Sequence, residues 1–285
     1  LPEQIKKAKE IAGGNGMVAV NIMAVTQLYE TYVKTACAAG VDAIISGAGL
    51  PTELPKFAEG YNVALAPIVS STKSANVILK FWDKKYHRTA DFLVIEGPLA
   101  GGHLGFSREQ LEDIPSLDYD TEIQNIIALK QTYEEKYQTT IPVFVAGGMF
   151  TAEDATHVME LGADGIQAAT RFVATEECDA SDAYKQAYVN ASDDDVIIIK
   201  SPVGMPGRAI KNAFIERMLA APDKISHCFN CLKACNPVTA PYCITQALIN
   251  AVVGDLDNGL IFCGSRVGEI KEITTVPKLM QELTV

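Results

Sequence analysis

The feature that most constrains the fold is a repeated alternation between short apolar runs and amphipathic segments. Each run is followed by glycine or small polar residues, and then by a stretch whose apolar side chains have helical spacing. The runs, which we predict to be strands, cover residues 17–23, 41–46, 63–69, 92–96, 143–146 and 165–168. Strands that are apolar throughout are buried on both faces, which predicts a parallel sheet covered by helices.

The intervening segments predict helices, and the alternation leaves two α/β architectures open. Helices are expected over residues 2–11, 26–39, 51–58, 72–86, 119–137 and 151–161. A doubly wound sheet and a (β/α)8 barrel both alternate strands with helices, and both bind ligands beyond the carboxyl ends of the strands. A closed barrel needs eight such units. If the fold is a barrel, we expect its first two βα units to be absent from this sequence, which begins at Leu1.

Composition excludes several classes of partner. The 285 residues are 48% hydrophobic and can bury a large core. Neither an apolar run of the ~20 residues that span a bilayer nor a leader pattern is visible, so we expect a cytoplasmic protein. The net charge of -11 argues against nucleic acid and anionic membrane surfaces. Seven cysteines in such a chain are expected to be thiols or metal ligands.

The glycine-rich segment 94–105 contains the candidate catalytic residue. The apolar run ends at Glu96, and glycines then flank His103. Glycine lets backbone approach a ligand closely, and an imidazole ionises near pH ~6.5. The segment is therefore either a ligand site at which His103 moves a proton, or a surface turn with a solvent-facing histidine.

Two later turns predict a phosphate site. Gly147 and Gly148 follow one apolar run, and Thr170 follows the next. Many barrels build a phosphate site from the loops after their last two strands, where exposed backbone N–H groups bind the anion. Either turn by itself would fit a plain tight connection, but the pair at this spacing favours phosphate.

Three motifs together carry a family resemblance. They are AGGHLG at 100–105, AGG at 146–148 and GADGIQAATRF at 162–172. The chain resembles the nitronate monooxygenases, formerly called 2-nitropropane dioxygenases, and the closely related flavin-dependent enoyl-acyl-carrier-protein reductases. The similarity runs from about Val18 to Arg208 and resumes at 259–264.

The resemblance implies a TIM barrel with FMN at the carboxyl ends of the strands. Residues 1–221 would form the FMN-binding barrel, as strands three to eight of the family pattern. Residues 222–285 would form a C-terminal segment whose helices pack on the barrel. By position, the resemblance implies FMN contacts from Asn21, Glu96, Gly101, Gly102, Gly147, Gly148, Gln167, Ala168, Ala169 and Thr170. It also implies that His103 is the catalytic residue facing the flavin.

The sequence departs from the usual family pattern at three of these places. Glu96 stands where many members have glutamine, Leu99 where many have glutamate, and Ala169 where glycine is common. An ionised carboxylate at Glu96 cannot donate a hydrogen bond. Leu99 removes a polar group near His103, which bears on the choice of substrate.

Three functions share these cofactor residues. A nitronate monooxygenase converts an alkyl nitronate and dioxygen to a carbonyl compound and nitrite, with His103 orienting the nitro group or removing the α-proton. An enoyl reductase instead takes electrons from NAD(P)H and passes hydride to an enoyl thioester. A flavoprotein that passes electrons to a partner through a metal or iron-sulfur centre is the third. A homodimer is compatible with each.

Two further segments have open interpretations. Cys228, Cys231, Cys235 and Cys243 are spaced C-x2-C-x3-C-x7-C, which favours zinc or an iron-sulfur cluster, with reduced structural thiols as the alternative. Residues 200–208 are either a mobile loop over the site, with Arg208 meeting an anionic substrate, or a plain Pro/Gly connection.

Overall fold

The computed structural model describes residues 1–222 and 224–284. The chain forms two compact units, each built from several segments. Unit 1 contains Leu1–Ile95, Asp118–Phe144 and Leu161–Asp164. Unit 2 contains Glu96–Leu117, Val145–Glu160 and the described part of Gly165–Val285.

The predicted strands form one sheet with the order β1-β2-β3-β4-β6-β7. Its strands are β1 (Ala19–Asn21), β2 (Ala43–Ser46), β3 (Ala64–Val69), β4 (Leu93–Glu96), β6 (Val143–Ala146) and β7 (Gly165–Gln167). The first four pair in parallel, with Ala19 beside Ala43 and Ala43 beside Ala64. The order follows the chain without reversal, whereas a doubly wound sheet reverses at its switch point.

This order is that of a barrel, and the α/β class is confirmed. In the described part of the chain the sheet has six strands. The eight-unit barrel and its two absent units therefore stay predictions, as does the division of the chain at residue 221.

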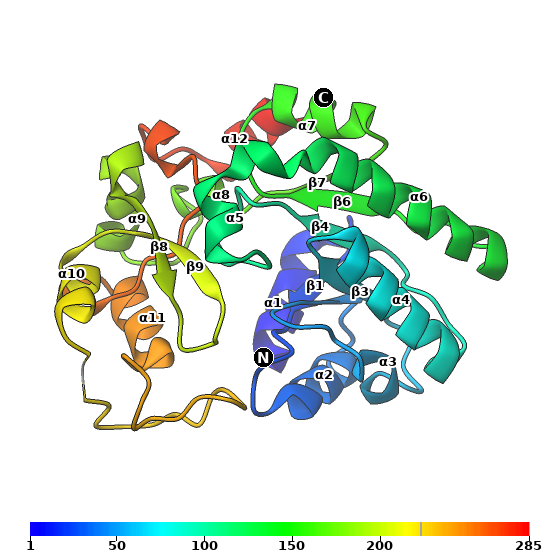
Figure 1. Ribbon diagram of the computed structural model, residues 1–285, viewed down its shortest axis with the longest axis horizontal. Coiled ribbons are helices and arrows are strands. Elements are labelled where there is room, and N and C mark those ends of the chain that lie inside the picture. The colour runs from blue at the N-terminus through cyan, green and yellow to red at the C-terminus, as the bar shows by residue number, and fades with distance from the viewer. Residues whose placement is uncertain (223, 285) are drawn as a thin grey trace. The chain divides into compact units, whose positions relative to one another are not determined.

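Unit 1 follows the sequence-based expectations closely. Its helices are α1 (Pro2–Ala12), α2 (Tyr29–Ala38), α3 (Leu54–Phe57), α4 (Thr72–Tyr86) and α6 (Tyr119–Tyr137). Helix α4 begins at Ser71, whose side chain accepts a hydrogen bond from the backbone N–H of Ser74 and so caps the helix. Trp82 of α4 is fully buried, and α4 lies beside α6 (Figure 1).

Unit 2 contains a small antiparallel sheet that corrects one sequence-based expectation. Its strands are β5 (Gly102–His103), β8 (Val196–Lys200) and β9 (Pro206–Ile210), in the order β5-β9-β8. Figure 1 shows β8 and β9 side by side. The sequence predicts that residues 200–208 form a mobile loop or a plain connection. The structure instead places the last three of these residues in strand β9. Arg208 is 3% exposed in β9 and donates to the carbonyl of Ala100, so it holds two backbone segments together and does not reach an anionic substrate from a mobile loop.

The described part of unit 2 also contains seven α-helices. They are α5 (Arg108–Glu112), α7 (Ala152–Glu160), α8 (Thr170–Val173), α9 (Asp182–Asn190), α10 (Ala213–Ala220), α11 (Ile244–Val253) and α12 (Val276–Leu283). Tyr188, Ala251 and Ile261 are buried together in one core cluster. Across the described residues of both units, no helix combines the length and apolarity needed to cross a membrane.

Candidate active site

The main candidate site is a cavity of about 290 Å³ in unit 2. Its volume is near the lower end of the ~300–1,000 Å³ typical of ligand pockets. Its wall includes the last residues of three strands of the parallel sheet, namely Glu96, Ala146 and Gln167. The cavity therefore lies at the carboxyl ends of these strands, where a barrel binds its ligand.

Most of the predicted cofactor residues line this one cavity. They are Glu96, Gly101, Gly102, Gly147, Gly148, Gln167, Ala168, Ala169 and Thr170. Asn21 ends β1 in unit 1, so its role stays a prediction. His103 lies in β5, next to Gly102 in the cavity wall, but His103 itself does not line this cavity.

Glycine is required at the wall because neighbouring backbone segments approach very closely. Gly147 has φ +95°, and a Cβ there would lie 2.9 Å from both the Ala100 nitrogen and the Gly97 oxygen. At Gly101 a Cβ would lie 2.5 Å from the carbonyl carbon of Cys263. Since no side chain fits at either position, the backbone itself forms this part of the wall.

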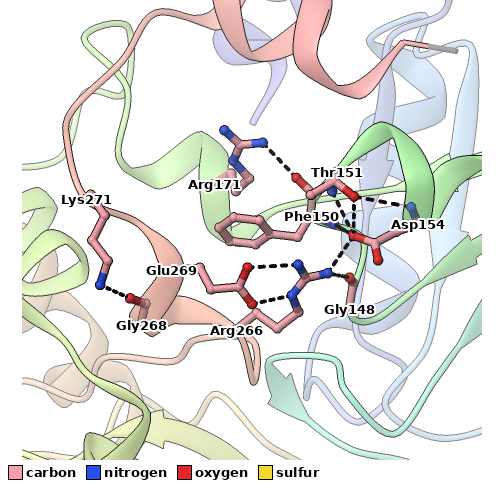
Figure 2. A network of polar contacts seen from close by, with 9 residues as sticks. All are labelled: Gly148, Phe150, Thr151, Asp154, Arg171, Arg266, Gly268, Glu269 and Lys271. Carbon is pink, nitrogen blue, oxygen red and sulfur yellow. Dashed lines mark hydrogen bonds and ion pairs between the residues drawn. The ribbon is translucent and has the colours of Figure 1, made fainter.

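A network around Arg266 holds the glycine turn in place (Figure 2). The Arg266 guanidinium donates to Glu269 through two nitrogens, at 2.5 and 2.8 Å, and to Asp154 at 2.5 Å. It also donates to the carbonyl oxygen of Gly148 at 3.1 Å. Asp154 accepts the backbone N–H groups of Phe150 and Thr151 at 2.9 and 2.7 Å. The turn after β6 is therefore tied to a segment more than 100 residues later.

Phe150 is the apolar part of this network. The guanidinium carbons of Arg171 and Arg266 lie 4.7 and 4.8 Å from the centre of its ring. Figure 2 shows the two guanidinium groups on opposite sides of that ring. Arg171 also donates to the Phe150 carbonyl at 2.7 Å. These cation–π contacts and hydrogen bonds fix the part of the cavity wall that Phe150 and Arg266 form.

Sequence reasoning missed this network and the hydroxyl of Ser265. Ser265 lines the cavity, and its buried oxygen has no hydrogen-bond partner among the described residues. A buried unpaired hydroxyl is costly and suggests a bound polar group. The only sequence signal was that the family resemblance resumes at 259–264, immediately before these residues.

Glu96 is a partly buried carboxyl in the cavity wall. Burial raises its pKa from 4.5 to about 7. Near neutral pH a substantial fraction is therefore protonated. In that form the carboxyl group can donate a hydrogen bond, as a glutamine amide does.

The His103 side chain is fixed by a hydrogen bond and an aromatic contact, and it is uncharged at neutral pH. Its Nε2 forms a hydrogen bond of 2.8 Å with the hydroxyl of Ser201, in the turn between β8 and β9. Its ring packs edge-on against Phe262, with centroids 5.0 Å apart, and Phe262 lines the cavity. Burial lowers the pKa of His103 to about 4. The sequence alone predicts an ordinary imidazole pKa of ~6.5 for His103. The structure corrects this expectation to a lower pKa.

The four clustered cysteines lie around a second, smaller cavity. Cys228, Cys231, Cys235 and Cys243 all line this space of about 60 Å³ in unit 2. All are free thiols. Within the described residues, no three His, Cys, Asp or Glu side chains are already arranged to hold a metal ion.

Fold and cavity together define the class of protein. The chain is an α/β protein with sequentially ordered strands and a glycine-walled ligand cavity at their carboxyl ends. It belongs to the nitronate monooxygenase family, whose sequence profile matches residues 2–285.

Individual relatives agree with this assignment. A probable nitronate monooxygenase of Staphylococcus saprophyticus is 32% identical over 135 residues, which are 47% of this chain and 36% of the relative. A Staphylococcus aureus protein of the same description is 30% identical over 128 residues, which are 45% of this chain and 34% of the relative. The matched stretch thus spans about a third of these curated relatives.

Solved structures resemble the chain over nearly its whole length. FabK from Thermotoga maritima is 25% identical with a TM-score of 0.74, over 99% of this chain and 80% of that one. Nitroalkane oxidase from Streptomyces ansochromogenes is 17% identical with a TM-score of 0.66, over 99% and 84%. The enoyl reductase domain of MlnA from Bacillus amyloliquefaciens is 13% identical with a TM-score of 0.65, over 99% and 85%. At these low identities, the similarity to the last two structures shows a shared fold and nothing more.

Proposed function

We propose that the cavity of unit 2 binds FMN and that the loaded protein is a nitronate monooxygenase. The reaction would convert an alkyl nitronate and dioxygen to a carbonyl compound and nitrite. The observation that carries the proposal is the convergence of four separate segments on one cavity, at residues 99–102, 146–150, 167–170 and 262–266, three of which contain glycine. Membership of the family supports the same reaction.

The residues of the cavity fit a flavin mononucleotide. The backbone of Gly148, Ala169 and Thr170 would hold the phosphate, with the unpaired Ser265 hydroxyl as a further donor. Gly101 and Gly102 offer a wall without side chains against which a flat ring can lie. When bound, the flavin supplies the electron-accepting chemistry that amino-acid side chains lack.

The protein's own residues would orient the substrate and handle its proton. Glu96 in its protonated form would donate a hydrogen bond into the cavity. His103 stays neutral at pH 7 and can accept the α-proton of a nitroalkane, as a weak base held by Ser201. A nitronate has already lost that proton, so His103 would only orient it.

The enoyl reductase and the electron-transfer flavoprotein remain alternatives. Both would use the same FMN contacts, so the cavity does not separate them from the monooxygenase. The reductase requires electrons from NAD(P)H and an enoyl thioester as substrate. The electron-transfer protein requires a protein partner, and a homodimer fits all three proposals.

One anaerobic experiment separates these functions. FMN-reconstituted protein is mixed with NADH in one cuvette and with an alkyl nitronate in another, and the flavin absorbance is followed. Fast bleaching by the nitronate alone is expected for the monooxygenase. Fast bleaching by NADH alone supports the reductase and refutes our assignment. Protein that takes up no FMN would refute the cavity assignment itself.

Ser265→Ala tests the phosphate contact without disturbing the fold. A hydrogen bond to a charged group is worth ~1.5–3 kcal/mol, which predicts FMN binding weaker by roughly 10- to 100-fold. The flavin-free protein should keep its stability, because the lost hydroxyl has no partner there. Thr274→Val is the matched control, since Thr274 has another unpaired buried hydroxyl and does not line the cavity. Equal FMN affinity in both variants would exclude the Ser265 contact.

A further inference from the structure

The cavity lined by Cys228, Cys231, Cys235 and Cys243 lies in a segment with little regular secondary structure. Between the end of α10 at Ala220 and the start of α11 at Ile244, the described residues form turns, bends, extended chain and a single β-bridge at Leu232, without a helix or a strand. Connections of this length are uncommon in compact domains unless they have a function. Leu232 and Tyr242 are 6% and 4% exposed, and the Tyr242 ring packs edge-on against Phe214 of α10, with centroids 5.2 Å apart.

All four thiols of this segment face one small space. The cavity of about 60 Å³ is lined by Cys228, Cys231, Cys235 and Cys243, together with apolar residues such as Leu232 and Ile244. A water molecule occupies roughly 30 Å³ in the liquid, so the space could admit a single ion. Four thiols exceed the two that a disulfide uses, and four cysteines are the usual ligand set of structural zinc and iron-sulfur sites.

Local backbone geometry fixes the positions of two of these cysteines. The backbone N–H of Asn230 donates to Cys228 Sγ at 3.3 Å, in a tight turn where Asn230 has φ +50°. Cys243 is the N-cap residue of the ten-residue helix α11. Both residues therefore have a locally fixed backbone, and both line the cavity.

We propose that Cys228, Cys231, Cys235 and Cys243 form a tetrathiolate metal centre. Because the described side chains do not yet form a finished site, the metal itself would draw the four sulfurs together. Each coordinating thiol gives up its proton to solvent, and no bond between sulfurs forms. The centre would fix the segment between α10 and α11, and the proposal is independent of the flavin assignment.

The test is metal content and metal affinity of the intact chain. Protein purified without chelators, in air and anaerobically, is analysed for zinc, iron and acid-labile sulfide. We expect about one zinc per chain, without acid-labile sulfide, in both preparations. Metal-stripped protein titrated with Co²⁺ should develop sulfur-to-cobalt charge-transfer absorption and release protons. Metal-free protein in both preparations, with no Co²⁺ absorption, overturns the proposal.

Single substitutions assign the ligands. Loss of a group that hydrogen-bonds to a metal ligand weakens metal binding by ~10- to 100-fold. Cys231→Ser and Cys235→Ser each remove a ligand itself, so each should weaken metal binding by more than this. Cys178→Ser is the matched control, because Cys178 is a partly buried free thiol that does not line the cavity. Thiol-reagent titration of the wild-type chain provides a readout that needs no variant: metal should protect four cysteines from reaction. Equal metal binding by Cys231→Ser, or no protection, contradicts the ligand set.

Discussion

Glu96→Gln is predicted to stabilise the flavin-free protein at high pH and not at low pH. Burial raises the pKa of Glu96 from 4.5 to about 7. The folded state therefore holds this proton more tightly than the unfolded state does. Stability is lost as the pH rises through the interval from about 4.5 to about 7, because the native carboxyl must then ionise in a buried position.

The size of the effect follows from the difference between the two pKa values. One pKa unit is worth about 1.4 kcal/mol, so ionised Glu96 destabilises the native state by roughly 3 kcal/mol once both states are deprotonated. Glutamine is nearly the same size and never carries this charge. The stabilisation by Glu96→Gln should therefore grow by roughly 3 kcal/mol between pH 4 and pH 9.

Urea unfolding followed by circular dichroism measures this difference directly. The free energy of unfolding of wild type and Glu96→Gln is compared at pH 4 and pH 9, without flavin. Glu59→Gln, at an exposed position, is the control for the chemical change from glutamate to glutamine. A pH-independent difference for Glu96→Gln, within ~0.5 kcal/mol, would refute the argument from burial.

Three further predictions concern the wall and the candidate base. His103→Asn should keep FMN but lose ~10²- to 10⁴-fold in turnover of a neutral nitroalkane, with a smaller loss on the nitronate; equal losses would make His103 an orienting residue only. Arg266→Lys keeps the charge but cannot form the two-nitrogen contact with Glu269, so urea unfolding should show a loss of ~1.5–3 kcal/mol; an unchanged midpoint would contradict the network. Gly101→Ala should destabilise by ~1–3 kcal/mol, because its Cβ meets Cys263 at 2.5 Å; wild-type stability would show that this contact relaxes freely.

Local patterns predicted the parts of the site that belong to the parallel sheet. The apolar runs that end at Glu96 and Ala146 mark strand ends, and parallel strands bring their carboxyl ends to one edge. The glycines after those strands were therefore expected at one ligand site. The cavity of unit 2 confirms that these segments lie together. Hydrophobic periodicity is a property of neighbouring residues, so it can be read without knowing the fold.

The sequence by itself determined the alternation of strands and helices, the glycine turns and the family. Tertiary structure alone decided that His103 sits in a two-residue strand opposite Gly207, where burial lowers its pKa to about 4. It also decided that Arg266 holds Asp154, 112 positions earlier in the chain. A pairing between distant residues leaves no periodic pattern in the sequence, and a pKa depends on the burial that only packing creates.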